Sequence, residues 1–413
     1  MPAPPTILTL NAGSSSIKFA LYRAGEPPVR GLHGSIERIG SGEARMAYVG
    51  APAGGAGDQR HESDVGSLDH PRAAEFLLDW LEDRVGLAAL AAVGHRIVHG
   101  GPRFYEPQRV GPAMLAELRR LSAFAPEHLP AALELIDRLG ERAPGLAQVA
   151  CFDTAFHRGM PQVARLLPIP RRYQAQGVER FGFHGLSYEY LMGELGRVAG
   201  RESAAGKVVL CHLGNGASLA AVKEGKCVDT SMAFTPAAGV PMSTRSGDLD
   251  PGLAWYLAQS EGMGAQQFDR MVNQESGLLG MSETSSDIRD LLAAESNDTR
   301  AAEAVAVFCY QVRKWIGAFA AALGGLDTLV FAGGIGENAP LIRARICADL
   351  GFLGVTLDAG RNEAGEAVIS ADGSRVVARV MRTDEDVIIA RAVFRVLASP
   401  SPQSNPPANP SEA

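Results

Sequence analysis

Two short loops of glycine, asparagine and serine each lie between two apolar runs of this chain. The first unit reads TILTLNAGSSSIKFALY (residues 6–22), and the second reads VVLCHLGNGASLAAVK (residues 208–223). Glycine lets a backbone approach a ligand closely, and successive N–H groups with small hydroxyls form an anion-binding nest. One such loop is weak evidence, because Gly-Ser turns between strands are common. Two in matching contexts predict a duplicated domain that holds a phosphate chain from both sides.

The polar residues of these loops have the types that phosphate binding needs. Ser14 and Ser16 are expected to donate hydrogen bonds to phosphate oxygens, and Lys18 supplies positive charge. An exposed lysine on a hairpin is the alternative for Lys18. Gly214, Asn215 and Gly216 form the predicted second nest.

The bulk composition limits what can surround such a site. The chain has 413 residues, 46% of them hydrophobic and 21% charged, with a formal net charge of -7. Its length suggests two to three domains, and its charge excludes a general nucleic-acid binder. No apolar run approaches the roughly 18 residues of a membrane span, and the start MPAPPT lacks a signal pattern. The five cysteines are scattered without CxxC spacing. We therefore expect reduced thiols and a cytoplasmic protein with no nucleic-acid or membrane partner.

The hydrophobic periodicity predicts alternating strands and helices in both halves of the chain. Residues 72–84 place Ala73, Leu77 and Leu81 on one helical face, together with Phe76 and Trp80. Further helices are expected at 112–123, 129–140, 187–199, 301–323 and 384–397, and strands within 6–50 and at 90–101, 148–156, 208–223 and 327–334. Residues 50–59 and 236–252 are expected to be loops, IGEN (335–338) a turn, and 399–413 too rich in proline and serine to fold. The pattern predicts an α/β protein of two similar domains with a ligand site between them, near the strand ends.

Eight motifs carry a resemblance to a known family. They are NAGSSSIKF (11–19), GHRIVHGG (94–101), FDTAFH (152–157), GFHGLSYEY (182–190), HLGNGAS (212–218), MSTRSGDLDP (242–251), GGIGEN (333–338) and TDED (383–386). From Thr6 to about Leu397 the chain resembles the acetate kinase family of acetate and propionate kinases, within the actin, Hsp70 and sugar kinase fold group.

This resemblance implies two ribonuclease H-like domains flanking an active-site cleft. It implies phosphoryl transfer between ATP and a short-chain carboxylate such as acetate, with Mg²⁺ (or Mn²⁺), in a homodimer joined through the second domain. The expected division is an acyl-phosphate-side domain at 1–150 completed by helix 384–398, and a nucleotide-binding and dimerisation domain at 151–383.

By similarity, Arg96 and Arg245 clamp the transferring phosphoryl group, and His184 hydrogen-bonds it in flight. A planar guanidinium suits this role, because it stays charged and binds phosphate oxygens two at a time. The simpler alternatives are that each arginine pairs with an aspartate on a surface loop, and that His184 is a packed residue before a helix capped by Ser187. The simpler interpretation of His157 is a structural role.

The resemblance also implies a magnesium site. Asp153 would orient the metal or act in catalysis, and Asn11 and Glu385 would lie at the metal. Asp153 ends an apolar strand, where α/β folds often place such chemistry. The alternative for Asp153 is a turn cap. For Glu385 it is a helix start with a capping box between Thr383 and Asp386.

The nucleotide is expected on the second half. The residues implied by similarity, besides Lys18 and the nest at 214–216, are His212, Asp287, Ile288, Arg289, Gly334, Ile335, Gly336, Glu337 and Asn338. GGIGEN could otherwise be only the start of the following helix.

The pocket for the acyl chain is the part where this sequence departs from the family pattern. By similarity to the family, Val98, Phe183 and Pro236 line this pocket. Glu127, before His128, stands where the family usually has a leucine. A buried carboxylate without a partner is unfavourable there. Other departures are Ser243 for glycine, Ala237-Ala238 for Leu-Glu, and Ile288 for an aromatic. Propionate or butyrate therefore remain alternative substrates, and an actin- or Hsp70-like switch ATPase is the alternative from another class.

Overall fold

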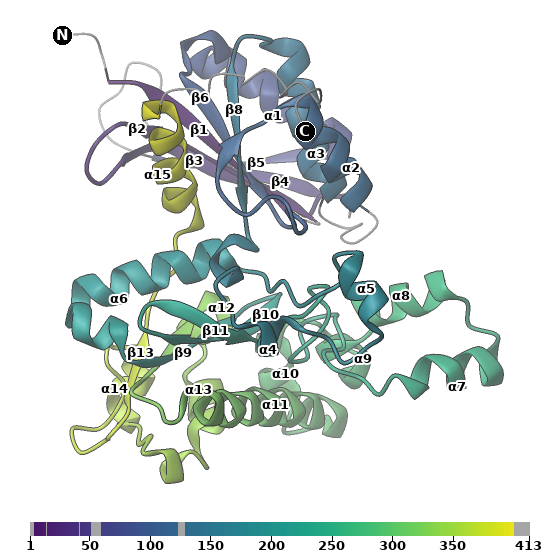
Figure 1. Cartoon of the computed structure of the whole chain (residues 1–413), viewed down its shortest axis with the longest axis vertical. Helices are drawn as coiled ribbons and strands as arrows, with labels where there is room; N and C mark the ends of the chain where they lie inside the picture. The colour runs from purple at the N-terminus through teal and green to yellow at the C-terminus, as the bar shows by residue number, and fades with distance from the viewer. Residues whose placement is uncertain (1–3, 14, 41, 51–58, 123–128, 400–413) are drawn as a thin grey trace, which may run out of the picture.

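The computed structural model describes residues 4–13, 15–40, 42–50, 59–122 and 129–399. It has two halves, each built on its own β-sheet (Figure 1). The first sheet has the order β5-β4-β3-β2-β1-β6-β8-β7, and the second has the order β11-β10-β9-β12-β13. The strands of the first sheet are β1 (Thr6–Ala12), β2 (Ser16–Arg23), β3 (Val29–Glu37), β4 (Ala44–Gly50), β5 (Gln59–Gly66), β6 (Ala92–Ile97), β7 (Gln108–Arg109) and β8 (Ala147–Phe152). Those of the second are β9 (Lys207–Leu213), β10 (Ala217–Lys223), β11 (Lys226–Thr230), β12 (Thr328–Ala332) and β13 (Val377–Val380).

The two sheets share one topology. In the first, β1 to β3 form an antiparallel meander, and β6 and β8 add in parallel on the other side of β1. In the second, β9 to β11 form the same meander, and β12 and β13 add in parallel beside β9. Each glycine-rich loop lies at the first hairpin of its sheet. The predicted duplicated α/β fold is therefore confirmed.

Helices cover both faces of each sheet. In the first half, α1 (His70–Val85) and α3 (Leu129–Arg142) pack on one face, beside α2 (Pro112–Leu121). The opposite face is covered by α15 (Glu385–Ala398), whose apolar residues pack on β1 and β6 after the chain returns from the second half (Figure 1). In the second half, α6 (Gly185–Ala205) and α11 (Thr299–Leu323) lie on opposite faces.

The remaining helices lie in the second half. They are α4 (Gln162–Arg165), α5 (Arg171–Ala175), α7 (Gly252–Glu261), α8 (Ala265–Gln274), α9 (Gly277–Ser282), α10 (Ile288–Ala294), α12 (Gly333–Asn338), α13 (Pro340–Cys347) and α14 (Ala359–Ala364). Short 3-10 turns occur at Leu87–Ala89, Ala155–His157 and Gly351–Leu353. None of the helices in the described part of the chain has the length and apolarity that a membrane crossing needs.

The helices and strands predicted from periodicity are confirmed, with shifts of one to a few residues at their ends. The turn predicted at IGEN was wrong, because GGIGEN forms the short helix α12. Ser187 does not cap α6, since the N-cap is His184 in a left-handed conformation. The capping box between Thr383 and Asp386 was also wrong, because Asp384 is the N-cap of α15 and accepts from the Val387 backbone N–H. Most of loop 50–59 and of the tail lies outside the described residues.

Candidate active site

A cavity of about 510 Å³ lies between the two halves and is lined by both glycine-rich loops. Its polar lining comes from five strands (β1, β2, β3, β6 and β9), the loop around Arg245, the starts of α6 and α15, and α12. The lining residues are Asn11, Gly13, Ser15, Ser16, Lys18, Arg30, Arg96, His184, His212, Gly214, Asn215, Gly216, Arg245, Gly333, Gly334, Glu337, Thr383, Asp384, Glu385 and Asp386.

Arg96 is the centre of a charged cluster on the first-half side of the cavity. It lies near the end of β6, and its Nε donates to Asp153 Oδ2 over 3.0 Å. Its Nη2 donates to the same oxygen over 2.5 Å, and its Nη1 donates to Asn11 Oδ1 over 3.1 Å. The Asn11 amide donates to Glu385 Oε2 over 2.9 Å, and that oxygen lies 3.9 Å from Arg96 Nε. Three strand ends and one helix start thus meet in one ring of contacts.

The alternative that Arg96 pairs with an aspartate is partly correct, but the pair is not on a surface loop. Asp153 is fully buried, and the Arg96 side chain is 13% exposed. The backbone N–H of Asp153 donates to the Ile97 carbonyl, which continues the β6–β8 pairing beyond the strand end. The ion pair therefore holds Arg96 at the cavity wall.

Burial and charge act in opposite directions on this cluster. Burial lowers the pKa of Arg96, but Asp153 and Glu385 raise it above its usual value overall. Burial raises the pKa of Asp153, and the Arg96 guanidinium opposes that rise. For Glu385 burial is outweighed by Arg96, His212 and Lys18, so its pKa is lowered. The single Arg96 guanidinium faces two carboxyl groups, Asp153 and Glu385, so its positive charge does not balance both, and a further cation would be attracted here.

The donor set fits the magnesium ion that the resemblance implies. Asp153 Oδ1 is buried and, among the described residues, accepts no hydrogen bond from a side chain, so it is available to a cation or its water. Among the described residues no group of three or more His, Cys, Asp or Glu side chains could hold a metal ion. Mg²⁺ does not require one, because it typically uses one or two carboxylates with waters and substrate phosphates.

Two stacked histidines form the second-half side of the cavity. The rings of His184 and His212 are 4.3 Å apart with an interplanar angle of 24°. Burial lowers the pKa of His212 to about 4. Burial also lowers the pKa of His184 well below its usual value, helped by the positive charges of Arg96 and Arg245. Both rings are therefore neutral at neutral pH.

Arg245, His184 and the second glycine-rich loop converge. A Cβ built on Gly216 would lie 3.2 Å from His184 Nε2 and 3.5 Å from Arg245 Nη1. The loop that carries Arg245 is held by a hydrogen bond from the Met242 backbone N–H to the Arg245 carbonyl (2.9 Å). Glycine at position 216 thus keeps space open between a guanidinium and an imidazole.

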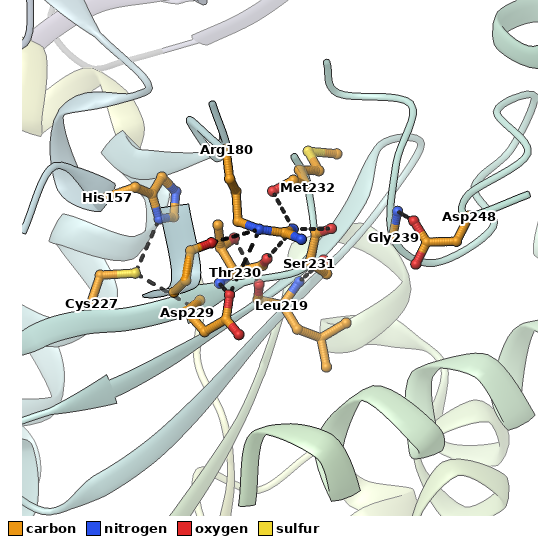
Figure 2. A network of polar contacts seen from close by, with 11 residues as sticks. His157, Arg180, Leu219, Cys227, Asp229, Thr230, Ser231, Met232, Gly239 and Asp248 are labelled. Atoms are coloured by element: carbon orange, nitrogen blue, oxygen red, sulfur yellow. Dashed lines mark hydrogen bonds and ion pairs between the residues drawn. The ribbon is translucent and has the colours of Figure 1, made fainter. Parts of the chain in front are cut away.

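A network around Arg180 fixes the loop that carries Phe183 and His184 (Figure 2). Arg180 Nη1 donates to the carbonyls of Thr230, Ser231 and Met232 at 2.9, 3.3 and 3.3 Å. The backbone N–H of Phe181 donates to the Ala233 carbonyl over 3.0 Å. Segments 180–182 and 230–233 are therefore joined side by side, with His184 following the first and Pro236 the second.

His157 has the structural role considered for it. Its ring nitrogens contact Cys227 Sγ at 3.2 Å and the Phe183 carbonyl at 2.9 Å. It is fully buried, and burial lowers its pKa to about 4. His157 thus supports the same loop as Arg180 does, through the Phe183 carbonyl.

Most of the residues predicted from the sequence meet at the cavity. They are Asn11, Ser16, Lys18, Arg96, His184, His212, Gly214, Asn215, Gly216, Arg245, Gly334, Glu337 and Glu385. Asp153 lies directly behind Arg96. Ser14 lies outside the described residues, as do Glu127 and His128.

Other predicted residues do not line this cavity. They are Val98, Phe183, Pro236, Asp287, Ile288, Arg289, Ile335, Gly336 and Asn338. Val98 and Phe183 belong to one buried apolar cluster, and Pro236 is half-buried. Ile288 is buried, whereas the Arg289 side chain is 86% exposed and pairs with Asp287, the N-cap of α10.

The sequence did not indicate Arg30, which also lines the cavity. Its Nε donates to the Tyr22 hydroxyl over 2.8 Å, and it forms an ion pair with Asp384. Thr383 and Asp386 were considered only as a capping pair, and Asp384 only as part of the TDED motif. The TDED motif was the available signal for them, since Glu385 was already assigned to the site.

A duplicated α/β fold with two facing phosphate-type loops is the architecture of a two-domain kinase. A family model described as the acetokinase family matches residues 6–391, and the chain belongs to this family. It is 45% identical over 396 residues to an acetate kinase of Rhodopseudomonas palustris, covering 94% of this chain and 98% of that protein. The resemblance seen in the eight motifs is thereby confirmed.

Solved structures agree with this assignment. The crystal structure of Porphyromonas gingivalis acetate kinase aligns with a TM-score of 0.82 at 35% identity, covering 95% of this chain and 100% of the other. A propionate kinase from Francisella tularensis aligns with a TM-score of 0.85 at 33% identity, covering 94% and 98%. The chain is thus a kinase that transfers phosphate to a carboxylate.

Proposed function

We propose that this protein is an acetate kinase, which reversibly transfers the γ-phosphoryl group of ATP to acetate by direct in-line transfer. The observation that carries the proposal is the cavity itself. Arg96 from the first half and Arg245 from the second both line it, and His184 lies under the charge of both. Phosphoryl transfer asks a protein mainly for positioning and charge neutralisation, which two guanidinium groups supply.

The residues at the cavity then have distinct roles in phosphoryl transfer. Arg96 and Arg245 bind the oxygens of the transferring phosphoryl group, and His184 donates a hydrogen bond to it. No general base is required, because an acetate carboxylate is already ionised near neutral pH. Asn11, Asp153 and Glu385 would hold Mg²⁺ or Mn²⁺, which when bound neutralises charge on the phosphate chain. Closure of the two halves would exclude water from the cavity.

The nucleotide is assigned to the second half. Its glycine loop at 214–216, with Gly334 and Glu337, lines the cavity opposite Ser16 and Lys18 of the first half. We place the acyl-phosphate side in residues 1–150 with helix 384–398, and the nucleotide side in 151–383. Asp287, Ile288, Arg289, Ile335, Gly336 and Asn338 would contact the adenosine beyond the cavity described above.

Propionate is the second candidate substrate, favoured by the likeness to propionate kinases. Val98, Phe183 and Pro236 are proposed to line the acyl pocket, and Val98 and Phe183 share one apolar cluster. One methylene in an apolar pocket changes discrimination by only about 1–3 kcal/mol. A side-by-side comparison of kcat/KM for acetate, propionate and butyrate decides the order.

The direct test of the function is ATP formation from ADP and acetyl phosphate. We expect rapid ATP synthesis that depends on the divalent cation. ATP hydrolysis without any ATP synthesis would instead support a switch ATPase of the actin type.

We further propose a homodimer joined through the second half. Helix α7 extends from the body of that half (Figure 1), and it exposes Trp255 (71%) and Tyr256 (63%). Aromatic side chains exposed together in this way are typical of subunit contacts. Sedimentation of Trp255→Glu should show monomers where the parent protein shows dimers, and a parent protein that sediments as a monomer would contradict the dimer. The five free cysteines are all buried, which suits a reducing cytoplasmic location.

A further inference from the structure

A chain of buried hydrogen bonds runs from the cavity wall into the second half. It starts at His184, whose Nδ1 lies 2.8 Å from Ser218 Oγ. Ser218 Oγ lies 2.5 Å from the Tyr188 hydroxyl. Ser218 and Tyr188 are both fully buried, on β10 and α6 respectively. Neither group is needed by the proposed transfer itself.

The direction of these hydrogen bonds follows from the number of donors. A buried hydroxyl loses free energy unless its proton reaches an acceptor. The Tyr188 hydroxyl meets Ser218 Oγ and the His212 backbone N–H, and the N–H can only donate, so the phenolic proton of Tyr188 goes to Ser218. The Ser218 proton then points away from Tyr188, and His184 Nδ1 is the acceptor that remains. Burial raises the pKa of Tyr188 well above its usual value, which keeps this donor protonated.

We propose that Tyr188 and Ser218 are positioning residues that hold neutral His184 with its proton on Nε2. The two ring nitrogens of a neutral imidazole differ, and the hydrogen bond at one nitrogen fixes the proton on the other. Nδ1 accepts from Ser218, so Nε2 carries the N–H. Nε2 is the atom that faces Gly216 and the cavity, where it would donate to an oxygen of the transferring phosphoryl group. The identity of that ligand rests on the proposed function, but the tautomer does not.

The neighbouring histidine shows why this arrangement is specific to His184. His212 Nδ1 lies 2.8 Å from Ser187 Oγ, and Ser187 Oγ lies 2.8 Å from Thr383 Oγ1. Both groups there are aliphatic hydroxyls, and Thr383 lines the cavity, where water or ligand is available to it. The Thr383 hydroxyl can therefore donate its proton to water or ligand and does not have to donate it to Ser187. Only the Tyr188 chain ends in a phenol that is closed off from the cavity.

The proposal also determines what His184 does not do. A protonated Nε2 has no lone pair directed at the cavity, so it cannot attack phosphorus. This agrees with direct transfer and excludes a phosphohistidine at His184 in the resting tautomer.

The tautomer can be read directly by nitrogen NMR of the full-length protein with ¹⁵N-labelled histidine rings, at neutral pH. The His184 signals are assigned as those lost in His184→Gln. We expect the pattern of an Nε2–H tautomer, and an Nδ1–H pattern would overturn the proposal. This measurement needs no turnover, so it stands even if acetyl phosphate gives no ATP, which would contradict the proposed function alone.

Two variants test the chain itself. Tyr188→Phe removes only the phenolic hydroxyl and frees Ser218 to accept from Nδ1–H, so the Nδ1–H form should grow. Ser218→Ala removes the bond to Nδ1. We expect kcat to fall about tenfold in Ser218→Ala and less in Tyr188→Phe, with KM for ATP changed less than about twofold, because loss of one transition-state donor acts on kcat.

The matched control is Thr9→Val, which deletes another fully buried hydroxyl that donates to the Ala20 carbonyl and lies outside the cavity lining. Its His184 signals and kcat should equal those of the parent protein. Unchanged kcat in both Tyr188→Phe and Ser218→Ala would overturn the proposal. If either variant fails to fold, the spectrum of the parent protein still decides the tautomer.

Discussion

The two halves of this protein share one strand order, yet they present different chemistry to the same cavity. At the ends of β6 and β8 the first half places Arg96 and Asp153. At the end of the equivalent strand β12, the second half places Gly333 and Gly334. The first-half wall is therefore built around a buried ion pair, whereas the second-half wall combines glycine backbone and two neutral imidazoles with Arg245 and Glu337.

The difference follows from how each half uses its strand ends. In the first half, buried side chains hold one another through ion pairs, so that the arginine is fixed before any ligand arrives. In the second half, Gly333 has a φ of 78°, and a Cβ there would lie 2.7 Å from the Leu213 carbonyl oxygen. The duplicated fold thus supplies one half with a preformed buried ion pair and one half whose glycine backbone lets a ligand approach closely.

Loss of a charged residue should have the largest effect. We expect Arg96→Ala and Arg245→Ala each to lower kcat by about a thousandfold, because each removes charge that acts on the transferring group. Arg96→Ala should also lose stability, because it leaves Asp153 buried without its partner, which typically destabilises by about 3–5 kcal/mol.

Steady-state kinetics and thermal unfolding of both variants check this prediction. Arg165→Ala is the control, since Arg165 pairs with Glu179 on a partly exposed segment away from the cavity. Equal loss of stability in both active-site variants, with little loss of kcat, would show that Arg245 is structural.

The glycine loops should respond differently to an added methyl group. In the second half, Gly216→Ala places a Cβ 3.2 Å from His184 Nε2. In the first half, Gly13→Ala meets Ser16 Oγ at 3.4 Å, an ordinary contact. We expect kcat/KM to fall about ten- to a hundredfold in Gly216→Ala, because small displacements of positioned groups are that costly, and to change little in Gly13→Ala. Equal effects in the two loops would contradict the division between the halves.

The sequence predicted the sheets and the charged side chains well, for physical reasons. Apolar runs such as those of β1 and β9 are buried on both faces and therefore read clearly as strands. Arg96 lies near the end of such a strand and Asp153 directly after one, so their motifs placed them at one edge of a sheet. Local sequence patterns were enough to predict these side chains, because the strand that carries each of them determines where it lies.

The sequence did not reveal contacts that join distant segments. Arg30 lies in a partly exposed strand, and its partner Asp384 is 354 residues away. Ser187 has the chemistry of a helix cap, but it bonds His212 and Thr383 instead. The helices between residues 252 and 294 were not predicted, and no residue of α7 or α8 is buried. Tertiary contacts, not local propensity, decide these positions.

The Arg180 network offers a smaller test within the second half. Arg180→Met removes the donors to the Thr230, Ser231 and Met232 carbonyls, which are then left without that partner (Figure 2). We expect a rise of up to about tenfold in KM for the carboxylate, because Phe183 and Pro236 are no longer held in register, and a smaller change in KM for ATP. Measurement of both KM values checks it, with Arg165→Met as the control. A change confined to ATP would place the acyl pocket elsewhere.

The smallest expected effect is a pH-dependent change in folding stability caused by the buried carboxyl group of Asp386. Burial, then Glu385 and Asp384, raise the pKa of Asp386 from 3.8 to about 6, and within the described part of the chain its buried Oδ1 has no hydrogen-bond partner. A carboxyl group whose pKa is higher in the folded state binds its proton more tightly there, so it favours folding at low pH, and this contribution is lost as pH rises through about 6. Asp386→Asn should therefore raise Tm by a few degrees at pH near 7.5, for a gain of at most about 3 kcal/mol, and the gain should vanish near pH 4. Thermal unfolding without nucleotide at about pH 7.5 and at about pH 4 measures this gain in Tm. A gain of equal size at both values would mean that packing of the amide, and not the charge of the first half, is responsible.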